Sequence, residues 1–246
     1  MNELSQVNFH NASSIFATID HNIAIVHAVL EGNSPGKIFV DTPHSPTIAL
    51  LYAEDAFFYV VGDENSASTT EIVPLIFDHV LPQMKEQEVV LFSFSDSWRR
   101  KLDELLHAKG AIQIHRKMYK FNPKRFSPQS FVLPDGFSLH GMEGQFTLAS
   151  KRFGVRLMDG DVLVSECSSV FVGGGEAEID IHTNEKYQRH GFATLTTSVF
   201  IEACLAKNLT PNWACWPERQ ASQMLANKLG FEELPDVPAH LWAVEM

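Results

Sequence analysis

The chain of 246 residues is 45% hydrophobic and 20% charged, and its formal net charge is −11. This length can bury a sizeable core, and the acidic balance argues against a nucleic-acid binder, which needs a basic face. Three widely spaced cysteines (Cys167, Cys204 and Cys215) indicate neither a disulfide framework nor a zinc site, so we expect free thiols in a cytoplasmic protein. The sequence has no apolar run long enough to span a membrane and no signal-peptide pattern at its start.

The first 125 residues predict alternating helices and short strands. Apolar residues from Ile15 to Leu30 return at helical spacing, with Asn11 or Ser13 as the expected cap and Gly32 as the stop. Further helices are predicted over 70–84 and from Asp96 or Ser97 to Gly110. Strands are predicted over 37–41, 47–52, 56–61, 89–94 and 111–121.

Four prolines and glycines between residues 122 and 136 predict a linker, so we place the domain boundary between residues 125 and 126. Beyond the linker, a strand is expected over 137–142 and one or two helical turns over 146–152. A hairpin over 154–158 and 162–172 is predicted around Asp159-Gly160-Asp161. The order strand, helix, glycine, strand occurs in both 1–125 and 126–246, which suggests an internal repeat.

The most informative stretch runs from Glu176 to Phe231. Ile179 and Ile181 alternate with acidic residues and His182, as in a half-buried strand. The segment Gln188-Arg189-His190-Gly191-Phe192-Ala193-Thr194 then precedes a helix that reaches Leu205. A glycine at a helix start lets a phosphate approach backbone N–H groups that have no intrahelical partner. The pattern favours an anion-binding loop, although an ordinary helix start has the same short signature.

These residues resemble a known family. Gln188-x-x-Gly191-x-Ala193 resembles the acetyl-CoA pyrophosphate loop of the GNAT superfamily of N-acetyltransferases, and Ser222-x-x-x-Ala226-x-Lys228-Leu229-Gly230-Phe231 is similar to the helix that closes its cofactor site. The segments Glu178–Thr183 and Pro211-x-Trp213, taken together with these motifs, resemble the zwittermicin-resistance-type subfamily of antibiotic-resistance acetyltransferases. The likeness covers about residues 155–232. It implies an α/β fold with a mixed sheet: a GNAT acetyltransferase domain over 126–246, preceded by a degenerate GNAT-like half over 1–125.

The resemblance also implies an activity and a cofactor. The chain is expected to be an N-acetyltransferase that moves an acetyl group from acetyl-CoA to a primary amine of a small molecule by direct attack. The pantetheine arm would lie along the strand ending at Thr183, where backbone groups polarise the thioester. The cofactor-binding residues implied are Ile181, His182, Thr183, Gln188, Arg189, His190, Gly191, Phe192, Ala193, Thr194 and Ser222, and no metal is expected.

The catalytic residues are less well determined by the sequence. Glu178, and after it Asp180, are expected to accept the ammonium proton, although an acidic face that only serves solubility has the same pattern. Ala226 stands where many members carry a tyrosine proposed as general acid, so water, Ser222 and a residue not identified from the sequence remain alternatives for that role. The runner-up function is a non-catalytic acyl-CoA-binding or regulatory module. The sequence leaves open the acceptor amine, the acyl-chain preference and whether the chain forms a homodimer.

Overall fold

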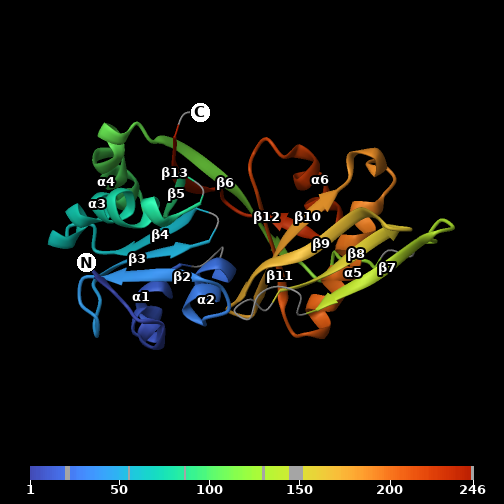
Figure 1. The fold of residues 1–246 in the computed structure, drawn as a ribbon, viewed down its shortest axis with the longest axis horizontal. Coiled ribbons are helices and arrows are strands. Elements are labelled where there is room, and N and C mark those ends of the chain that lie inside the picture. The colour runs from blue at the N-terminus through green and yellow to red at the C-terminus, as the bar shows by residue number, and fades with distance from the viewer. Residues whose placement is uncertain (20–22, 55, 86, 129–130, 144–151, 245–246) are drawn as a thin grey trace. The chain divides into compact units, whose positions relative to one another are not determined.

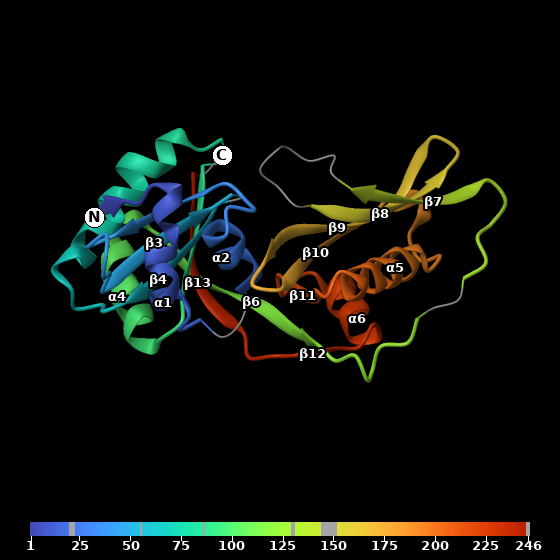
Figure 2. The same cartoon turned by 90° about the horizontal axis from the view of Figure 1, so that it is seen from below.

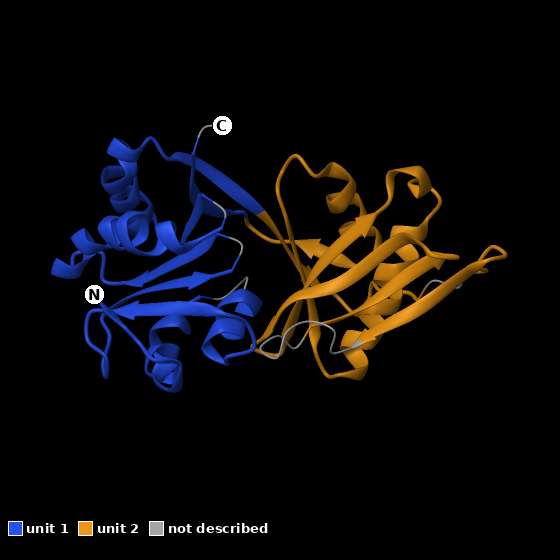
Figure 3. Cartoon of the chain, in the orientation of Figure 1, with its two compact units in different colours: residues 1–116, 236–246 blue, residues 117–235 orange. Residues whose placement is uncertain are grey.

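The structure, a computed structural model, describes residues 1–19, 23–54, 56–85, 87–128, 131–143 and 152–244 (Figure 1). The chain forms two compact units, which we call unit 1 (1–116 with 236–246) and unit 2 (117–235) (Figure 3). The chain passes from unit 1 to unit 2 after residue 116 and returns to unit 1 at residue 236, so the last segment of the chain belongs to the first unit. Both units combine helices with a mixed sheet, which confirms the predicted α/β class.

Unit 1 is built on a sheet with the strand order β1-β2-β3-β4-β5-β13-β6. Only the β4–β5 pair in this order is parallel, and its other described pairs are antiparallel. The bounds are β1 Asn2–Glu3, β2 Gly36–Val40, β3 Ile48–Ala53, β4 Phe57–Gly62, β5 Glu88–Ser93, β6 Ile112–Phe121 and β13 Val237–Ala243. The sequence does not predict β13, because this segment contains Pro238 and its apolar and polar residues do not alternate cleanly.

The helices of unit 1 are shorter and less regular than their sequence periods predict. The helix expected over 15–30 is replaced by separate pieces. The helix expected over 70–84 is present as a continuous run of 3-10, α and π turns from Ala67 to Gln83. Ser95, and not Asp96 or Ser97, caps α4: its hydroxyl accepts from the Trp98 amide at 3.1 Å. The bounds are η1 Gln6–Ala12, α1 Ser13–Phe16, α2 Ile23–Leu30, η2 Ala67–Glu71, α3 Ile72–Pro74, η3 Leu75–Val80, η4 Leu81–Gln83, α4 Asp96–Leu106 and η5 His107–Lys109.

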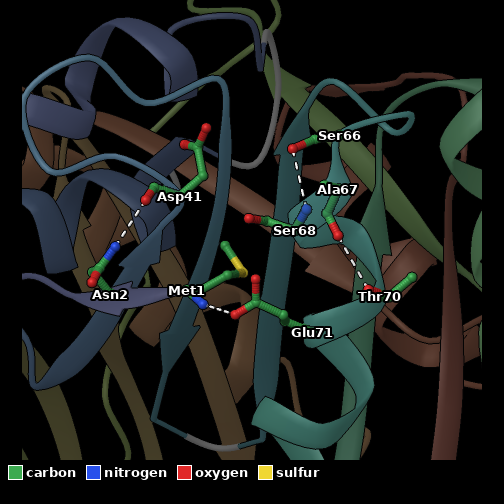
Figure 4. Close-up of polar contacts among 8 residues, drawn as sticks. All are labelled: Met1, Asn2, Asp41, Ser66, Ala67, Ser68, Thr70 and Glu71. Atoms are coloured by element: carbon green, nitrogen blue, oxygen red, sulfur yellow. Dashed lines mark hydrogen bonds and ion pairs between the residues drawn. The ribbon is translucent and has the colours of Figure 1, made fainter.

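The start of the chain is fastened to unit 1 by polar contacts (Figure 4). The Met1 ammonium pairs with the Glu71 carboxylate of η2, and the Asn2 side chain donates to the Asp41 carbonyl at 2.8 Å. Ser66 caps η2, because its hydroxyl accepts from the Ser68 amide at 3.4 Å. These contacts hold the short strand β1 at the edge of the sheet, where it pairs with β2.

Unit 2 has the strand order β12-β6-β11-β10-β9-β8-β7, with β10–β11 as the parallel pair. Helices α5 and α6 lie beside each other against this sheet and share one apolar core with it (Figure 2). The bounds are β7 Phe137–Glu143, β8 Phe153–Asp159, β9 Val162–Gly173, β10 Glu176–Thr183, η6 Glu185–Tyr187, α5 Phe192–Ala206, β11 Thr210–Cys215, α6 Gln220–Lys228 and β12 Phe231–Glu233. The helical turns expected over 146–152 fall almost entirely outside the described residues.

The two units repeat one topology, as the internal repeat predicts. In each, a parallel strand pair flanks a helical connection (β4 and β5, β10 and β11), and a further helix and strand follow (α4 and β6, α6 and β12). In each unit one more strand lies between the strand that precedes this last helix and the strand that follows it. In unit 1 this is β13, between β5 and β6. In unit 2 it is the second half of β6, whose residues 117–120 pair with β11 and 119–121 with β12. Each unit therefore depends on a strand that its own repeat does not supply.

Candidate functional site

The parallel strands β10 and β11 are paired at one end and separate toward the other. Their register runs from Glu176 opposite Thr210 to Glu178 opposite Asn212 and stops there. Beyond this point β10 continues to pair with β9, whereas β11 continues to pair with β6. The opening between them, which we call the fork, leaves the inner edge of the second half of β10 without a strand partner among the described residues. An extended ligand can bond to such an edge as an additional strand would.

The side chains of β10 alternate between the core and the opposite face. Ala177 and Ile179 are buried in the core that contains α5, and Ile181 packs against the same core. Glu178 projects from the other face and is only 3% exposed, whereas Asp180 and His182 on that face are exposed. The structure therefore separates the two expected carboxylates by burial: Glu178 lies at the closed end of the fork and Asp180 in its open part.

Glu176, at the start of β10, is bonded to a side chain on the neighbouring strand. Its carboxylate accepts a hydrogen bond of 2.7 Å from the Asn212 side chain on β11, and both residues are shielded from bulk solvent. A register shift in the pairing with β9 between Ala177 and Ile179 marks the same place. Such an irregularity bends a strand locally, which fits the departure of β10 from β11.

The loop between β10 and α5 ends in an uncapped helix start. Gly191 is the N-cap of α5 with φ = 84°, a left-handed conformation that glycine adopts without the steric cost of a side chain. Arg189 also has positive φ, at 65°, which is uncommon for a residue with a side chain. No described side chain caps the helix at Gly191, so the N–H groups of the first turn, from Phe192 to Thr194, lack the usual side-chain acceptor.

Side chains hold this loop on the end of β10. The Thr183 and Thr196 hydroxyls both bond to the buried Ser165 hydroxyl, at 2.9 and 3.0 Å. The Gln188 side-chain amide donates to the Thr183 carbonyl at 3.3 Å. The His190 Nδ1 faces two carbonyl oxygens, those of Gln188 at 2.8 Å and Tyr187 at 3.2 Å, so that nitrogen carries the proton and Nε2 is left on the outer side of the ring. The loop is therefore fixed to the strand before any ligand binds.

Aromatic packing fixes the first residue of α5. The Phe192 side chain is 5% exposed, and its ring stacks with those of Phe137 at 5.2 Å and His190 at 5.8 Å between centroids. The Tyr187 hydroxyl donates to Asp159 at 2.9 Å, which raises the pKa of the phenol, with burial as a lesser cause. Phe192 can thus offer a ligand its backbone N–H, but its ring belongs to the core.

Helix α6 borders the same loop. The Lys228 ammonium donates to the Thr194 hydroxyl at 3.3 Å, which brings a positive charge to the first turn of α5. The Ser222 hydroxyl accepts from the buried Trp213 indole at 3.1 Å and keeps its own proton for a further bond. Ala226 is fully buried in the core. Lys228 belongs to the motif Ser222-x-x-x-Ala226-x-Lys228, but its contact with Thr194 joins two segments far apart in the sequence, and no local pattern predicts it.

The outer strands extend the polar face on which Asp180 lies. In register, Ser168 of β9 stands opposite Asp180, and Glu166 stands opposite His182. Glu166 in turn pairs with Arg156 of β8, with 2.5 Å between the guanidinium Nε and the carboxylate. Both residues are half-buried, so this is a positioned ion pair and not a fully solvated one. No group of three or more metal-ligating side chains occurs among the described residues.

The three cysteines are buried, free thiols. Burial raises the pKa of Cys204 to about 12 and that of Cys167 well above its ordinary value. Cys215, at the end of β11, is a member of the unit 2 core. These positions agree with the expectation that the cysteines pack in the interior.

The expected cofactor-binding residues therefore gather in one region of unit 2. They lie at the end of β10, in the loop before α5, in the first turn of α5 and on α6. No helix in the described ranges has the length and apolar content needed to cross a bilayer.

Comparison with known proteins identifies the family. A family model described as GNAT acetyltransferase matches residues 13–149 and 144–237. A curated relative, the uncharacterized N-acetyltransferase YdfB of Bacillus subtilis (strain 168), is 26% identical over 96% of this chain and 97% of its own length. A GCN5-related N-acetyltransferase-like protein from Streptococcus suis 89/1591 superposes with a TM-score of 0.70 at 20% identity, covering 96% of this chain and 98% of that one. A tandem GNAT protein from the clavulanic acid biosynthesis pathway superposes with a TM-score of 0.63 at 11% identity, over 98% and 95% of the two chains. The chain thus has the tandem GNAT fold and belongs to the GNAT acetyltransferase family of N-acetyltransferases.

Proposed function

We propose that unit 2 binds acetyl-CoA and transfers its acetyl group to a primary amine of a small molecule. One observation carries the proposal: the fork between β10 and β11 opens beside a helix whose first turn has no side-chain cap. The open edge of β10 suits an extended pantetheine arm, and the helix start suits a phosphate group. Acetyl-CoA contains both of these groups. The inner edge of β10 and the start of α5 belong to one continuous segment, from Glu176 to Thr194.

The residues present fit this cofactor. Apart from the chain neighbours of Gly191, a Cβ built on this glycine would meet, among the described residues, only the Phe131 ring within 4 Å, at 3.5 Å. The helix start already favours negative charge through its macrodipole. Arg189 and His190 directly precede it in the chain, and the Lys228 ammonium bonds to Thr194 in its first turn. The pyrophosphate would bind the N–H groups from Gly191 to Thr194, with Gln188 and Arg189 at its edge. Ser222 would add a hydroxyl from α6.

The inner edge of β10 would hold the pantetheine arm. Acetyl-CoA supplies the activated acetyl group as a thioester. The Thr183 carbonyl already accepts from Gln188, and the His182 carbonyl accepts from the Ser165 hydroxyl at 3.1 Å, so the Thr183 N–H and the backbone of Ile181 would be the groups that bond the arm. A backbone N–H aimed at the thioester oxygen stabilises the negative charge that develops there, a contribution of about 3 kcal/mol for a well-placed donor.

Carboxylates on β10 would take the proton of the attacking amine. Asp180 is exposed in the open part of the fork, so an amine from solvent can reach it directly. Glu178 is buried at the closed end, where it would act through a water molecule. As the amine nitrogen bonds to the acyl carbon, the carbon–sulfur bond breaks and the thiolate leaves. Ser222 or water would protonate the thiolate, because Ala226 cannot.

The acceptor would be a cationic small molecule. The formal charge of −11 and the carboxylates of Asp180 and Glu166 on one face favour an amine-bearing ligand over an anion. An aminated natural product of the kind suggested by the zwittermicin-resistance resemblance fits this face. A cytoplasmic location would keep the buried thiols reduced.

A non-catalytic acyl-CoA-binding or regulatory module is the second candidate. The observation in its favour is that Ala226, in the position of the usual tyrosine acid, is fully buried and packed among apolar side chains. Such a module would bind acetyl-CoA and leave amines unmodified.

A coupled assay separates the two candidates. The purified protein would be incubated with acetyl-CoA and a panel of primary amines, and the release of free thiol would be measured. We expect turnover with some cationic amines, with Asp180→Asn lowering kcat/KM and shifting its pH profile, and Glu178→Gln as the second test of the base. Acetyl-CoA binding without turnover on any amine would favour the module. An unchanged profile in both variants would place the base elsewhere.

A further inference from the structure

Phe131 of the linker lies beside the glycine of the proposed phosphate site. Its ring packs edge-on against Phe192, with 6.0 Å between centroids and 62° between ring planes. Its Cε2 atom is 3.5 Å from where a Cβ of Gly191 would stand. The linker therefore brings an aromatic ring to the N-terminus of α5 from about sixty residues earlier in the chain.

This ring is not part of the core. Phe131 is 38% exposed, whereas Phe192, on which it rests, is 5% exposed. Phe192 is itself held by the stacked ring of Phe137. Phe131 is thus an aromatic surface at the rim of the loop, oriented by a buried neighbour that has little freedom to move.

A second exposed ring, that of His190, also packs on Phe192. The exposed His190 ring stacks on Phe192 at 5.8 Å with 18° between planes, and two carbonyl contacts fix its Nδ1. Phe131 and His190 therefore flank Gly191, the residue at which the proposed function places a pyrophosphate. Exposed aromatic rings beside a phosphate-binding site are what a nucleobase uses for stacking, because every base has a π face.

We propose that Phe131 is the platform for the adenine base of the acyl-CoA, with His190 as the second ring at the edge of the site. The inference rests on the proposed function and adds to it a recognition element outside the loop motif. In acyl-CoA a single ribose joins the adenine to the pyrophosphate. With the pyrophosphate at Gly191, the adenine would therefore lie close to the side chains around Gly191. The linker thereby becomes part of the cofactor site.

The competing role for Phe131 is structural. Its contact with Phe192 would then serve only to seat the linker on α5, and its loss would loosen the loop for every ligand that binds there. The two roles differ in what the ligand must contain. A stacking platform contributes only to ligands with a base, whereas a structural anchor contributes to all ligands of the loop equally.

Calorimetric titration of Phe131→Ala with two ligands separates these roles. Acetyl-CoA carries the base, and S-acetyl-4′-phosphopantetheine lacks it. We expect Phe131→Ala to weaken acetyl-CoA about five- to hundredfold, the effect of losing one base-stacking ring, and to leave the truncated ligand unchanged. Acetyl-dephospho-CoA, which keeps the base but lacks the 3′-phosphate, should lose affinity by the same factor as acetyl-CoA. The matched control is Val132→Ala, since Val132 is the next residue and 93% exposed; it should bind both ligands as the wild type does.

A second variant gives a direct optical signal. Phe131→Trp preserves the ring, so it should retain acetyl-CoA affinity, and its fluorescence should be quenched by acetyl-CoA and not by the truncated ligand. An equal loss for both ligands in Phe131→Ala, or no loss for either, would overturn the platform. Failure of the wild type to bind acetyl-CoA at all would overturn the proposed function and this inference together, and is recognised before any variant is compared.

Discussion

The Asn212 side-chain amide donates to the Glu176 carboxylate at 2.7 Å, so the last paired residue of β11 is bonded to the first paired residue of β10. The contact spans the short parallel ladder, beyond which the two strands separate. Asn212 is 8% exposed, so the bond is made in a shielded environment, where hydrogen bonds to charged groups are worth more than at the surface. The contact therefore ties β10 to β11 over their paired residues, on the closed side of the fork.

Replacing Asn212 by aspartate should reverse this contact. Two carboxylates would then face each other at the closed end of the fork, and the like charges would disfavour the folded state at neutral pH. We expect the variant to lose about 1–3 kcal/mol of unfolding free energy at pH 7, measured by thermal or urea unfolding. The pair would share a proton in the folded state, which raises a folded pKa above its unfolded value, so the deficit should shrink as the pH falls toward 4. A deficit that stays constant with pH would contradict this account of the contact.

In unit 1, Asp103 of α4 should make stability depend on pH. Its carboxylate accepts from Gln113 at 2.6 Å and from His240 at 2.8 Å, and these hydrogen bonds, that of Gln113 first, lower its pKa below the ordinary value. A lowered folded pKa stabilises the protein above the unfolded pKa of about 4, and the stabilisation is lost as the pH falls through the folded value. The side chain is 44% exposed, so solvent screening keeps the effect modest. The unfolding free energies of the wild type and Asp103→Ala should differ at pH 5.5, and the difference should narrow steadily as the pH falls below about 4; a difference that does not narrow with falling pH would contradict the assignment.

The buried thiols should resist modification in the native protein. Only the thiolate reacts, and burial raises the pKa of Cys204 to about 12 and that of Cys167 well above its usual range. Alkylation at pH 8 should therefore be slow in the folded state and fast for all three cysteines in denaturant. Rapid labelling of Cys167 or Cys204 in the native protein, read by mass spectrometry, would mean that the core opens more readily than its packing indicates.

The strand arrangement predicts which fragments of the chain can fold. A fragment of residues 126–246 lacks β6, whose residues 117–121 pair with both β11 and β12, so it should fail to unfold cooperatively. A fragment of residues 111–246 keeps β6 and β13 and should retain a cooperative transition and acetyl-CoA binding. Circular dichroism melts of the two fragments provide the measurement. Equal folding of both would mean that residues 117–121 are dispensable to unit 2.

Local features of unit 2 were predictable because their signals are local. The positive φ of Gly191, the helix that follows it and the hairpin around Gly160 each depend on residues within a few positions. The placement of β13 in unit 1 was not predictable. Its pairing with β5 and β6 joins residues far apart in the sequence, and such a pairing produces no periodic pattern within the strand itself. Residue periodicity alone could not have shown it.

Burial along β10 illustrates the same limit. Alternation correctly put Ile179 and Ile181 opposite the acidic residues, but it could not distinguish buried Glu178 from exposed Asp180. Nor could it show that Glu176 is bonded to Asn212, because that contact depends on the register with β11. The N-cap of α4 shows the same limit. Ser95, Asp96 and Ser97 are all suitable capping residues, and the structure shows that Ser95 is the one that caps the helix.

The central claim is that the uncapped start of α5 at the fork binds acetyl-CoA. Calorimetric titration of the wild type, Gly191→Val and Gly160→Val with acetyl-CoA tests it most directly. Both glycines have positive φ, at 84° and 54°, so both substitutions carry backbone strain, but only Gly191 stands at the proposed site. We predict micromolar binding by the wild type and by Gly160→Val, and at least a tenfold loss in Gly191→Val. Equal affinity in all three proteins, or no binding by the wild type, would contradict the claim.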